Sequence, residues 1–225
     1  MPTLHVTGTQ PHDIKVLTNS APLESIDVSG ITSMNIQMAY GDETIVNLAA
    51  HSMWIGGVSL SADDTLIVDG PGSWYNTSSS INGNAIIAVP VIGSGVINQF
   101  IGHDVGKLEF MSSVSSGQTV NDSGYEFYGG EHGRVQVDNP AAYHATTVLG
   151  FGDLILEGLH ASAYTYHNDM LTLFNGAKVV DSLKIDIQTL EYQKPGPLGV
   201  ANGMGGVVIY TDGAGANLPK IAFHH

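Results

Sequence analysis

The segment GKLEFMSSVSSGQTV, residues 106–120, decides the fold class of this sequence. It begins with a strand-like phrase of polar and apolar residues, continues through a run of Ser and Gly, and starts another strand at Val120. No reactive side chain stands between the two strands. The pattern predicts one coil of a stacked β scaffold, with Leu108, Phe110 and Val114 pointing inward and the small residues forming a corner.

Similar phrases recur along the 225-residue chain. Runs of about four to eight β-favouring residues, each closed by Gly, Asn, Asp or Ser, follow one another almost without interruption. The best candidate for a helical turn is PAAYHATTV (140–148), with Pro140 at a suitable first position. The sequence therefore predicts an all-β protein.

The spacing of the strands narrows the architecture. Intervals of about 8 to 12 residues suit a β-sandwich, a jelly roll or a solenoid. Short strands, corners of small residues and recurring phrases favour a β-solenoid, which is β-helix-like, with a β-sandwich or jelly roll as the alternative. We expect two regions, a solenoid module at residues 101–225 and an N-terminal β region at residues 1–100. The N-terminal region is a candidate divergent copy of that module.

Composition and charge exclude several classes of function. The chain has 21 Asp plus Glu against seven Lys plus Arg, a net charge of −14, and no cysteine. Nucleic acid is excluded as a partner because phosphate binding needs a basic surface. Disulfides and thiolate chemistry are excluded as well. The sequence contains no apolar run of about 18 residues, so it predicts no membrane span.

Small polar residues replace charged ones, which make up only 12% of the chain. This bias is typical of β-rich extracellular proteins. The N-terminal stretch MPTLHVTGTQPHD has neither the basic nor the apolar region of a Sec signal peptide. We therefore expect an extracellular or cell-surface location, reached without a cleavable N-terminal Sec signal.

Four phrases in the second half also carry a resemblance. They are LEF…SSGQTV (108–110 and 115–120), VDNP (137–140), GFG-DLIL (150–156) and LTLFNG (171–176). Residues 102–188 thereby resemble a module of large bacterial secreted and surface proteins, the adhesin-like, autotransporter-passenger-like and RTX-adhesin-like β-solenoids. The resemblance implies a stacked scaffold without a catalytic site. The calcium-binding nonapeptide G-G-x-G-x-D of related secreted proteins is absent from the sequence.

Acid-rich corners make Ca²⁺ a candidate cofactor, because hard cations prefer several oxygen ligands around one point. The alternative is that these residues occupy turns, where their side chains bond to the nearby backbone. The ten histidines show no H-x-x-x-H or H-E-x-x-H spacing, which argues against a zinc site. The candidate calcium ligands are Asp63, Asp64 and Asp69.

One cluster, YEFYGGEHGR (125–134), combines aromatic, acidic and basic side chains. Aromatic faces with polar edges suit carbohydrates, and a glycosidase or polysaccharide lyase would use its carboxylates. The alternative is an ordinary tyrosine-rich strand and glycine corner. The candidate carbohydrate-binding residues are Tyr125, Tyr128, Glu131, His132 and Arg134.

These observations favour a non-enzymatic structural protein. We expect it to be secreted or displayed at the cell surface and to self-associate into a filament, an adhesive layer or an extracellular matrix such as that of a biofilm. Strand-like ends, MPTLHVTGTQ and GANLPKIAFHH (215–225), favour a homo-oligomer or filament formed by strand donation or end-to-end stacking. The alternative is a carbohydrate-binding or carbohydrate-cleaving β-helix protein with a polysaccharide partner.

Overall fold

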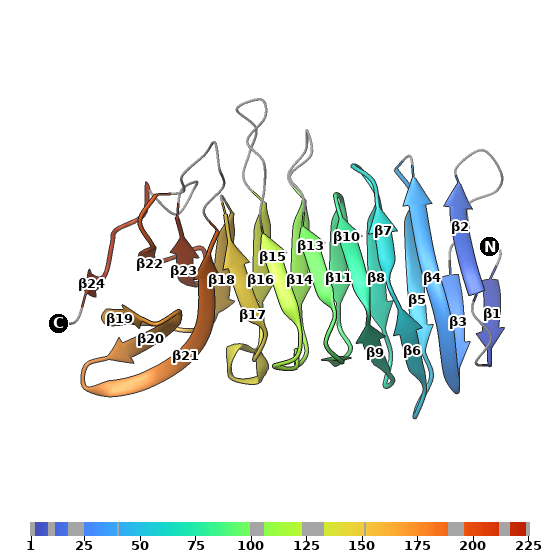
Figure 1. Ribbon diagram of the computed structural model, residues 1–225, viewed down its shortest axis with the longest axis horizontal. Coiled ribbons are helices and arrows are strands. Elements are labelled where there is room, and N and C mark those ends of the chain that lie inside the picture. Colours follow the sequence, from blue (N-terminus) through green and yellow to red (C-terminus); the bar gives the residue numbers. More distant parts are fainter. Residues whose placement is uncertain are drawn as a thin grey trace.

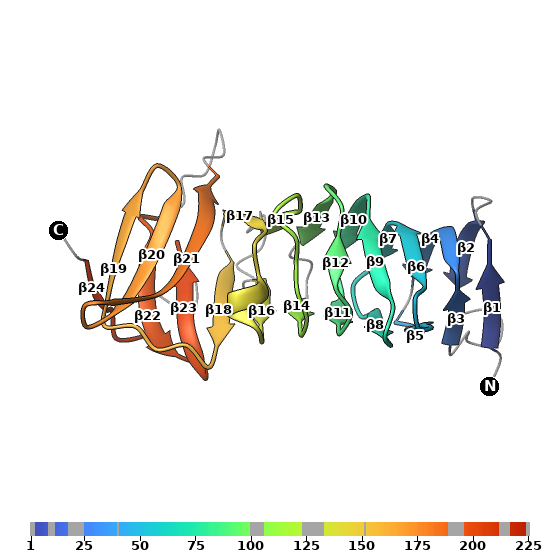
Figure 2. The same ribbon diagram turned by 90° about the horizontal axis from the view of Figure 1, so that it is seen from below.

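The all-β class and the β-solenoid architecture predicted from the sequence are confirmed by the computed structural model (Figure 1). It describes residues 3–8, 12–17, 25–39, 41–99, 106–122, 133–150, 152–188, 196–211 and 217–223, with residues 12–17 described by their backbone. The strands stack along the long axis of the molecule, with β1 at one end and β24 at the other (Figures 1 and 2).

The first sheet, sheet A, has ten strands. In spatial order they are β1 (Thr3–Thr7), β3 (Ser25–Ser29), β5 (Glu43–Leu48), β8 (Thr65–Asp69), β11 (Asn84–Ile87), β14 (Lys107–Phe110), β16 (Arg134–Val137), β18 (Asp153–Glu157), β23 (Gly206–Tyr210) and β22 (Gly199–Gly203).

The second sheet divides at β4 (Ile31–Ala39), because the first half of β4 pairs with β6 and the second half with β7. Sheet B contains β2 (His12–Leu17), β4, β7 (Val58–Leu60), β10 (Ser78–Ile81), β13 (Val96–Gln99), β15 (Thr119–Asp122), β17 (Thr146–Leu149), β21 (Lys178–Ile187), β20 (Met170–Asn175), β19 (Ala163–His167) and β24 (Ala222–Phe223). Sheet C contains β4, β6 (Met53–Gly56), β9 (Ser73–Asn76) and β12 (Val91–Ile92).

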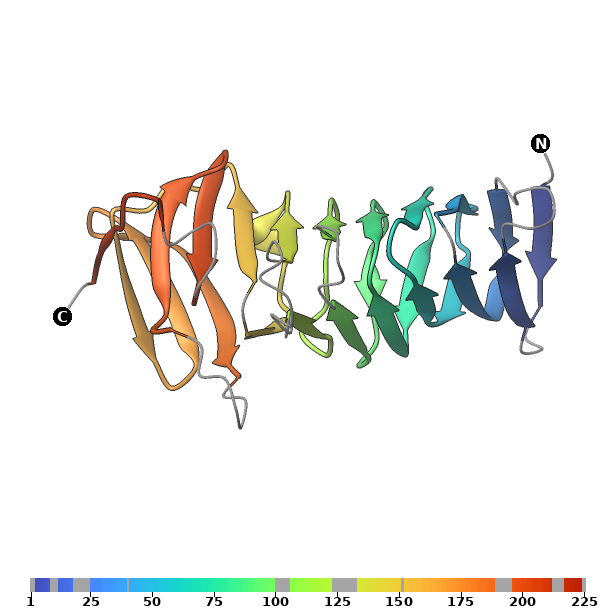
Figure 3. The ribbon, with the colours of Figure 1, turned by 90° about the horizontal axis from the view of Figure 1, so that it is seen from above.

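A typical coil passes from sheet A to sheet C to sheet B, as β5, β6 and β7 do, and the next coil repeats this path (Figure 3). Neighbouring coils pair in parallel and in register, so that Leu108 faces Val135 and Val135 faces Leu154. Inward residues therefore stack on inward residues. A slip of one residue would turn every apolar side chain outward, so the alternating pattern fixes the register.

The segment 106–120 has the structure expected from its sequence. Leu108, Phe110 and Val114 are all buried in the core. Val114 forms isolated parallel bridges with Val91 and with Tyr143, which continue sheet C beyond its last strand. The helical turn predicted at residues 140–148 is also present, as a short 3₁₀ helix, η1 (Pro140–Ala142).

Two tryptophans stack inside the solenoid beneath sheet C. The rings of Trp54 and Trp74 are parallel within 11°, and their centroids lie 4.8 Å apart. Both residues are fully buried. Their indole N–H groups donate to the carbonyl oxygens of Met34 and Gly56, at 2.7 and 3.0 Å. The pair therefore fills the core without leaving a polar atom unsatisfied.

The C-terminal region departs from the parallel pattern, because tight turns reverse the chain. Asn168 and Asp169 have positive φ angles of 49° and 60° and form a two-residue turn between β19 and β20. Met204 and Gly205, at 51° and 88°, do the same between β22 and β23. As a result, antiparallel strands extend sheet A and sheet B at this end of the molecule.

One buried hydrophobic cluster runs from Val6 to Ile209. The boundary expected between residues 100 and 101 lies outside the described residues. The strand-like end predicted within residues 215–225 contains β24, which pairs with β19 of the same chain. In the part of the chain that the structure describes, no helix is long and apolar enough to cross a membrane.

We expect Trp74→Ala to lower the free energy of unfolding by about 3–5 kcal/mol, because it removes half of the stack and leaves a cavity. Tyr75→Ala, at the neighbouring and 36% exposed position, serves as the control and should cost about 1 kcal/mol or less. Urea unfolding followed by circular dichroism measures both values. Equal losses would show that the stack adds nothing to the core.

Candidate functional site

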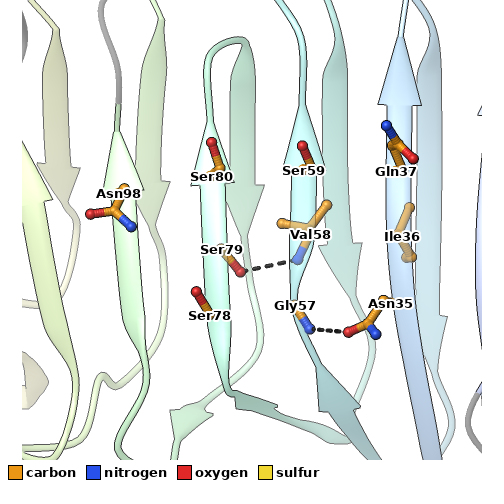
Figure 4. A pocket seen from close by; sticks show the side chains of 10 residues that line it. All are labelled: Asn35, Ile36, Gln37, Gly57, Val58, Ser59, Ser78, Ser79, Ser80 and Asn98. Atoms are coloured by element: carbon orange, nitrogen blue, oxygen red, sulfur yellow. Dashed lines mark hydrogen bonds between the residues drawn. The ribbon is translucent and has the colours of Figure 1, made fainter.

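A groove lies on the outer face of sheet B, across β4, β7, β10 and β13 (Figure 4). Its volume is about 410 Å³. Figure 4 shows Gln37, Ser59 and Ser80 at a similar level on neighbouring strands. Its lining is built from outward side chains and the backbone between them, at Asn35, Ile36, Gln37, Gly57, Val58, Ser59, Ser78, Ser79, Ser80 and Asn98.

The groove exists because the residue just before β7, Gly57, has no side chain. Gly57 lies between Asn35 and Ser78 at this level of the sheet, and a Cβ atom on Gly57 would collide with the Ser78 carbonyl. The Gly57 N–H donates to Asn35 Oδ1 at 3.1 Å, and the Val58 N–H donates to Ser79 Oγ at 3.1 Å (Figure 4). Side chains from both neighbouring strands thereby hold the floor of the groove.

A buried amide network supports this floor from inside the protein. The Ser79 hydroxyl donates to Asn76 Oδ1 at 2.7 Å, and Asn76 Nδ2 donates to Gln118 Oε1 at 2.8 Å. Gln118 Nε2 in turn donates to the Ile92 carbonyl at 2.8 Å. Satisfied buried networks of this kind rigidify the backbone around them, so the groove is preformed.

The lining has a distinct chemistry for this protein. None of its ten residues carries a charge, although the chain has a net charge of −14. Within the described residues, the side chains of Gln37, Ser59, Ser78 and Ser80 make no hydrogen bond to the protein. Hydroxyl and amide groups both donate and accept hydrogen bonds. The groove therefore suits a neutral ligand rich in hydroxyl groups.

Most of the carbohydrate cluster predicted from the sequence is not placed by the structure. Tyr125, Tyr128, Glu131 and His132 lie outside the described residues. Arg134 is the one member that the structure places. It begins β16 in sheet A, where its register neighbours are Lys107 and Asp153.

The three candidate calcium ligands separate into two places. Asp63 and Asp64 form the corner before β8, and Asp69 ends that strand, about 17 Å further along the backbone. Asp64 is buried, and its carboxylate accepts three backbone N–H groups, from Gly41 and Asp42 on Oδ1 and from Ser61 on Oδ2. The described residues contain no group of three or more metal-binding side chains around one point. The observed contacts of Asp64 are those of a corner-stabilising residue.

A buried carboxyl group, that of Asp122, lies at the end of β15. Asp122 is fully buried, and neither carboxyl oxygen has a hydrogen-bond partner. It packs against Gly152, where any Cβ atom would collide with it. Burial, and to a smaller extent the nearby charge of Asp153, raises the pKa of Asp122 to about 8. Gln99 Oε1, at the adjacent register position, is a buried acceptor without a partner, which suits a protonated neighbour.

The groove lining contains no acid, histidine or aromatic residue, so no motif of such side chains marks it in the sequence. A signal was nevertheless present in the spacing. Asn35, Gly57 and Ser78 recur at intervals that match the coil length, and the string SSS at residues 78–80 is unusual for a strand. Recognising it would have required the alignment of coils, which the irregular coil lengths conceal.

In comparisons with known proteins, no protein-family model, no curated protein and no solved structure matches this chain.

The first prediction for this region separates a structural role of Asp64 from a role in calcium binding. Asp64→Ala should lower the free energy of unfolding by about 2–4 kcal/mol, because three backbone donors lose their charged acceptor. The loss should be the same with millimolar calcium and with a chelator. Asp64→Asn keeps an oxygen acceptor and should lose less. A loss seen only with calcium present would instead identify Asp64 as a ligand.

The second prediction concerns Asp122 and pH. Between pH of about 4 and about 8 the unfolded chain releases the Asp122 proton while the folded protein keeps it. The free energy of unfolding should therefore fall by up to about 1.4 kcal/mol for each unit by which the pH rises. Asp122→Asn should flatten this slope and stabilise the protein at pH 8 and above. Asp69→Asn, an exposed carboxylate, should leave the slope unchanged. Denaturant unfolding across this pH range tests both, and equal slopes in all three proteins would contradict the assignment.

Proposed function

We propose that this chain is a carbohydrate-binding β-solenoid that holds a neutral polysaccharide on sheet B without cleaving it. The observation that carries the proposal is the preformed, uncharged groove of hydroxyl and amide side chains. A neutral sugar offers many hydroxyl groups and no charge. Such a ligand matches groups that both donate and accept hydrogen bonds.

The outer face of sheet B favours a linear polymer over a single sugar. Side chains on neighbouring strands repeat at about 4.8 Å along the solenoid axis, the spacing of paired strands. Beyond the groove the row of polar residues continues, since Asn98 accepts a hydrogen bond from Asn121 at 3.1 Å. Thr119 and Thr146 occupy the parallel row at successive register positions. Val96 lies between Ser78 and Thr119 in that row and is 37% exposed. An extended chain laid across the strands would therefore meet hydroxyl and amide groups together with an apolar side chain.

The groove lining supports binding without cleavage. Glycoside hydrolysis in most families uses a pair of carboxyl groups on either side of the scissile bond. The ten lining residues include no Asp or Glu, and no His. We therefore assign the groove to recognition. An extracellular or cell-surface location follows as part of the proposal, supported by the low content of charged residues and by the resemblance to bacterial adhesin-like modules.

Self-association into a filament or matrix is the second candidate function. It is favoured by β1, which is the edge strand of sheet A at the N-terminal end. Within the described residues β1 pairs only with β3. Leu4 occupies an inward position, yet it is 38% exposed, while its register partner Ile26 is completely buried. A row of unpaired backbone groups beside exposed apolar surface is an adhesive edge.

The groove assignment is tested by filling it. Ser59 is exposed at the centre of the groove, so Ser59→Trp should block binding without disturbing the core. Replacing both Gln37 and Ser80 with Ala should weaken binding about tenfold, as expected for the loss of two hydrogen bonds. Titration calorimetry with dextran and laminarin as neutral probes, and polygalacturonate as the acidic probe, measures the affinity.

The matched control is Thr65→Trp, which adds the same bulk to the outer face of sheet A. It should bind the neutral probes as the unmodified protein does. Two outcomes would contradict the groove assignment: equal affinity of the Ser59 and Thr65 variants, or binding of the acidic probe alone. Release of reducing ends from any probe would contradict a role in recognition only.

A further inference from the structure

Both ends of the solenoid present one strand of sheet A and one strand of sheet B (Figures 1 and 2). At the N-terminal end these strands are β1 and β2, and within the described residues each pairs with a single strand, β3 and β4 respectively. At the C-terminal end they are β22 and β19, and among the described residues the two-residue β24 follows β19 in sheet B.

The directions of these strands match. In sheet A, β23 runs antiparallel to β18, and β22 runs antiparallel to β23. In sheet B, β20 runs antiparallel to β21, and β19 runs antiparallel to β20. Two reversals restore the original direction, so β22 and β19 run parallel to the ladders of the solenoid body. The C-terminal end therefore offers a further coil the same strand direction that each coil in the body offers its neighbour.

The segment 217–223, which we call the strap, occupies both of these edges. Lys220 forms an antiparallel bridge with Ala201 of β22, and the Ile221 N–H donates to the Val200 carbonyl at 3.0 Å. The strap then crosses to sheet B, where its strand β24 pairs in parallel with β19. Edge strands are commonly covered in this way to prevent pairing with another chain.

The strap buries little of its surface, because five of its seven described residues are exposed. Within the described residues its ladder with β19 has two residue pairs, which bring the Phe223 ring edge-on to Tyr164 at 5.3 Å. Phe223 is 47% exposed, Leu218 packs on the small apolar cluster outside sheet A, and the partly buried Ile221 packs against the main core. A segment with little buried apolar surface opens at a low free-energy cost compared with the core.

We propose that residues 217–223 are an autoinhibitory strap, and that its release lets the β1–β2 end of a second copy stack in parallel on β22 and β19. This inference rests on the self-association proposed above and assigns its two surfaces. The second copy fits because its strands match in sheet and direction and because Leu4 carries the apolar column of the core to an exposed edge. The contact is head-to-tail, so repeated addition builds a filament.

The test is the association of strap variants, measured by sedimentation velocity over a range of protein concentrations. Deleting residues 217–225 should raise the association constant at least tenfold, and Phe223→Asp should act in the same direction. In the deletion background, Leu4→Glu should restore the monomer, because it places a charge at the stacked edge. Thr7→Glu, which points outward on the same strand, is the matched control and should leave the assemblies intact.

A locked strap supplies the opposite test. Ala163 and Ala222 are register partners, so a cysteine pair at these positions can form a disulfide, and the sequence contains no other cysteine. The oxidised protein should remain monomeric at every concentration, and reduction should restore the behaviour of the unmodified chain. This variant decides the matter even where the deletion fails to fold.

Three outcomes would overturn the proposal. They are a folded deletion variant that stays monomeric, an assembly that ignores Leu4→Glu, and an oxidised locked strap that associates like the reduced form. Polysaccharide binding measured on the same variants should not change, because the groove lies on β4 to β13. Failure of the strap and failure of the groove assignment are therefore distinguishable.

Discussion

In-register parallel pairing between coils is the constraint on which the rest of this structure depends. It places each inward apolar side chain on the inward side chain of the coil before, as Leu108, Val135 and Leu154 illustrate. The same register aligns the outward side chains. Rows of Ser, Asn and Gln on sheet B are thus a consequence of how the core stacks, and the groove forms where one of those rows contains Gly57.

The corners of the coils carry the polar residues that such stacking requires. Where the chain leaves a strand, backbone N–H groups lose their ladder partners, and a buried unpaired group is costly. Asp64 accepts three of these groups, and Asn76, Ser79 and Gln118 form a network at another corner. Asp122 departs from this rule, since its buried carboxyl is stabilised in the protonated form instead.

The two ends of the solenoid differ in a way that connects structure with assembly. The C-terminal strands reverse twice in each sheet and so keep the direction of the body, and the strap then covers them. The N-terminal edge is left with Leu4 exposed. The net charge also opposes association, because copies that each carry −14 repel one another at low ionic strength. The proposed stacking and the proposed sugar binding involve separate surfaces of the same scaffold.

The sequence by itself determined the fold class, the inward residues of segment 106–120 and the turn at Pro140, because these follow from local alternation and from corner residues. It did not reveal the antiparallel C-terminal strands, whose pairing is decided by turn angles at residues such as Asn168 and Met204. Nor did it reveal the groove. Gln37, Ser59 and Ser80 are unremarkable alone, and only the stacking of coils about 22 residues apart brings them onto one face.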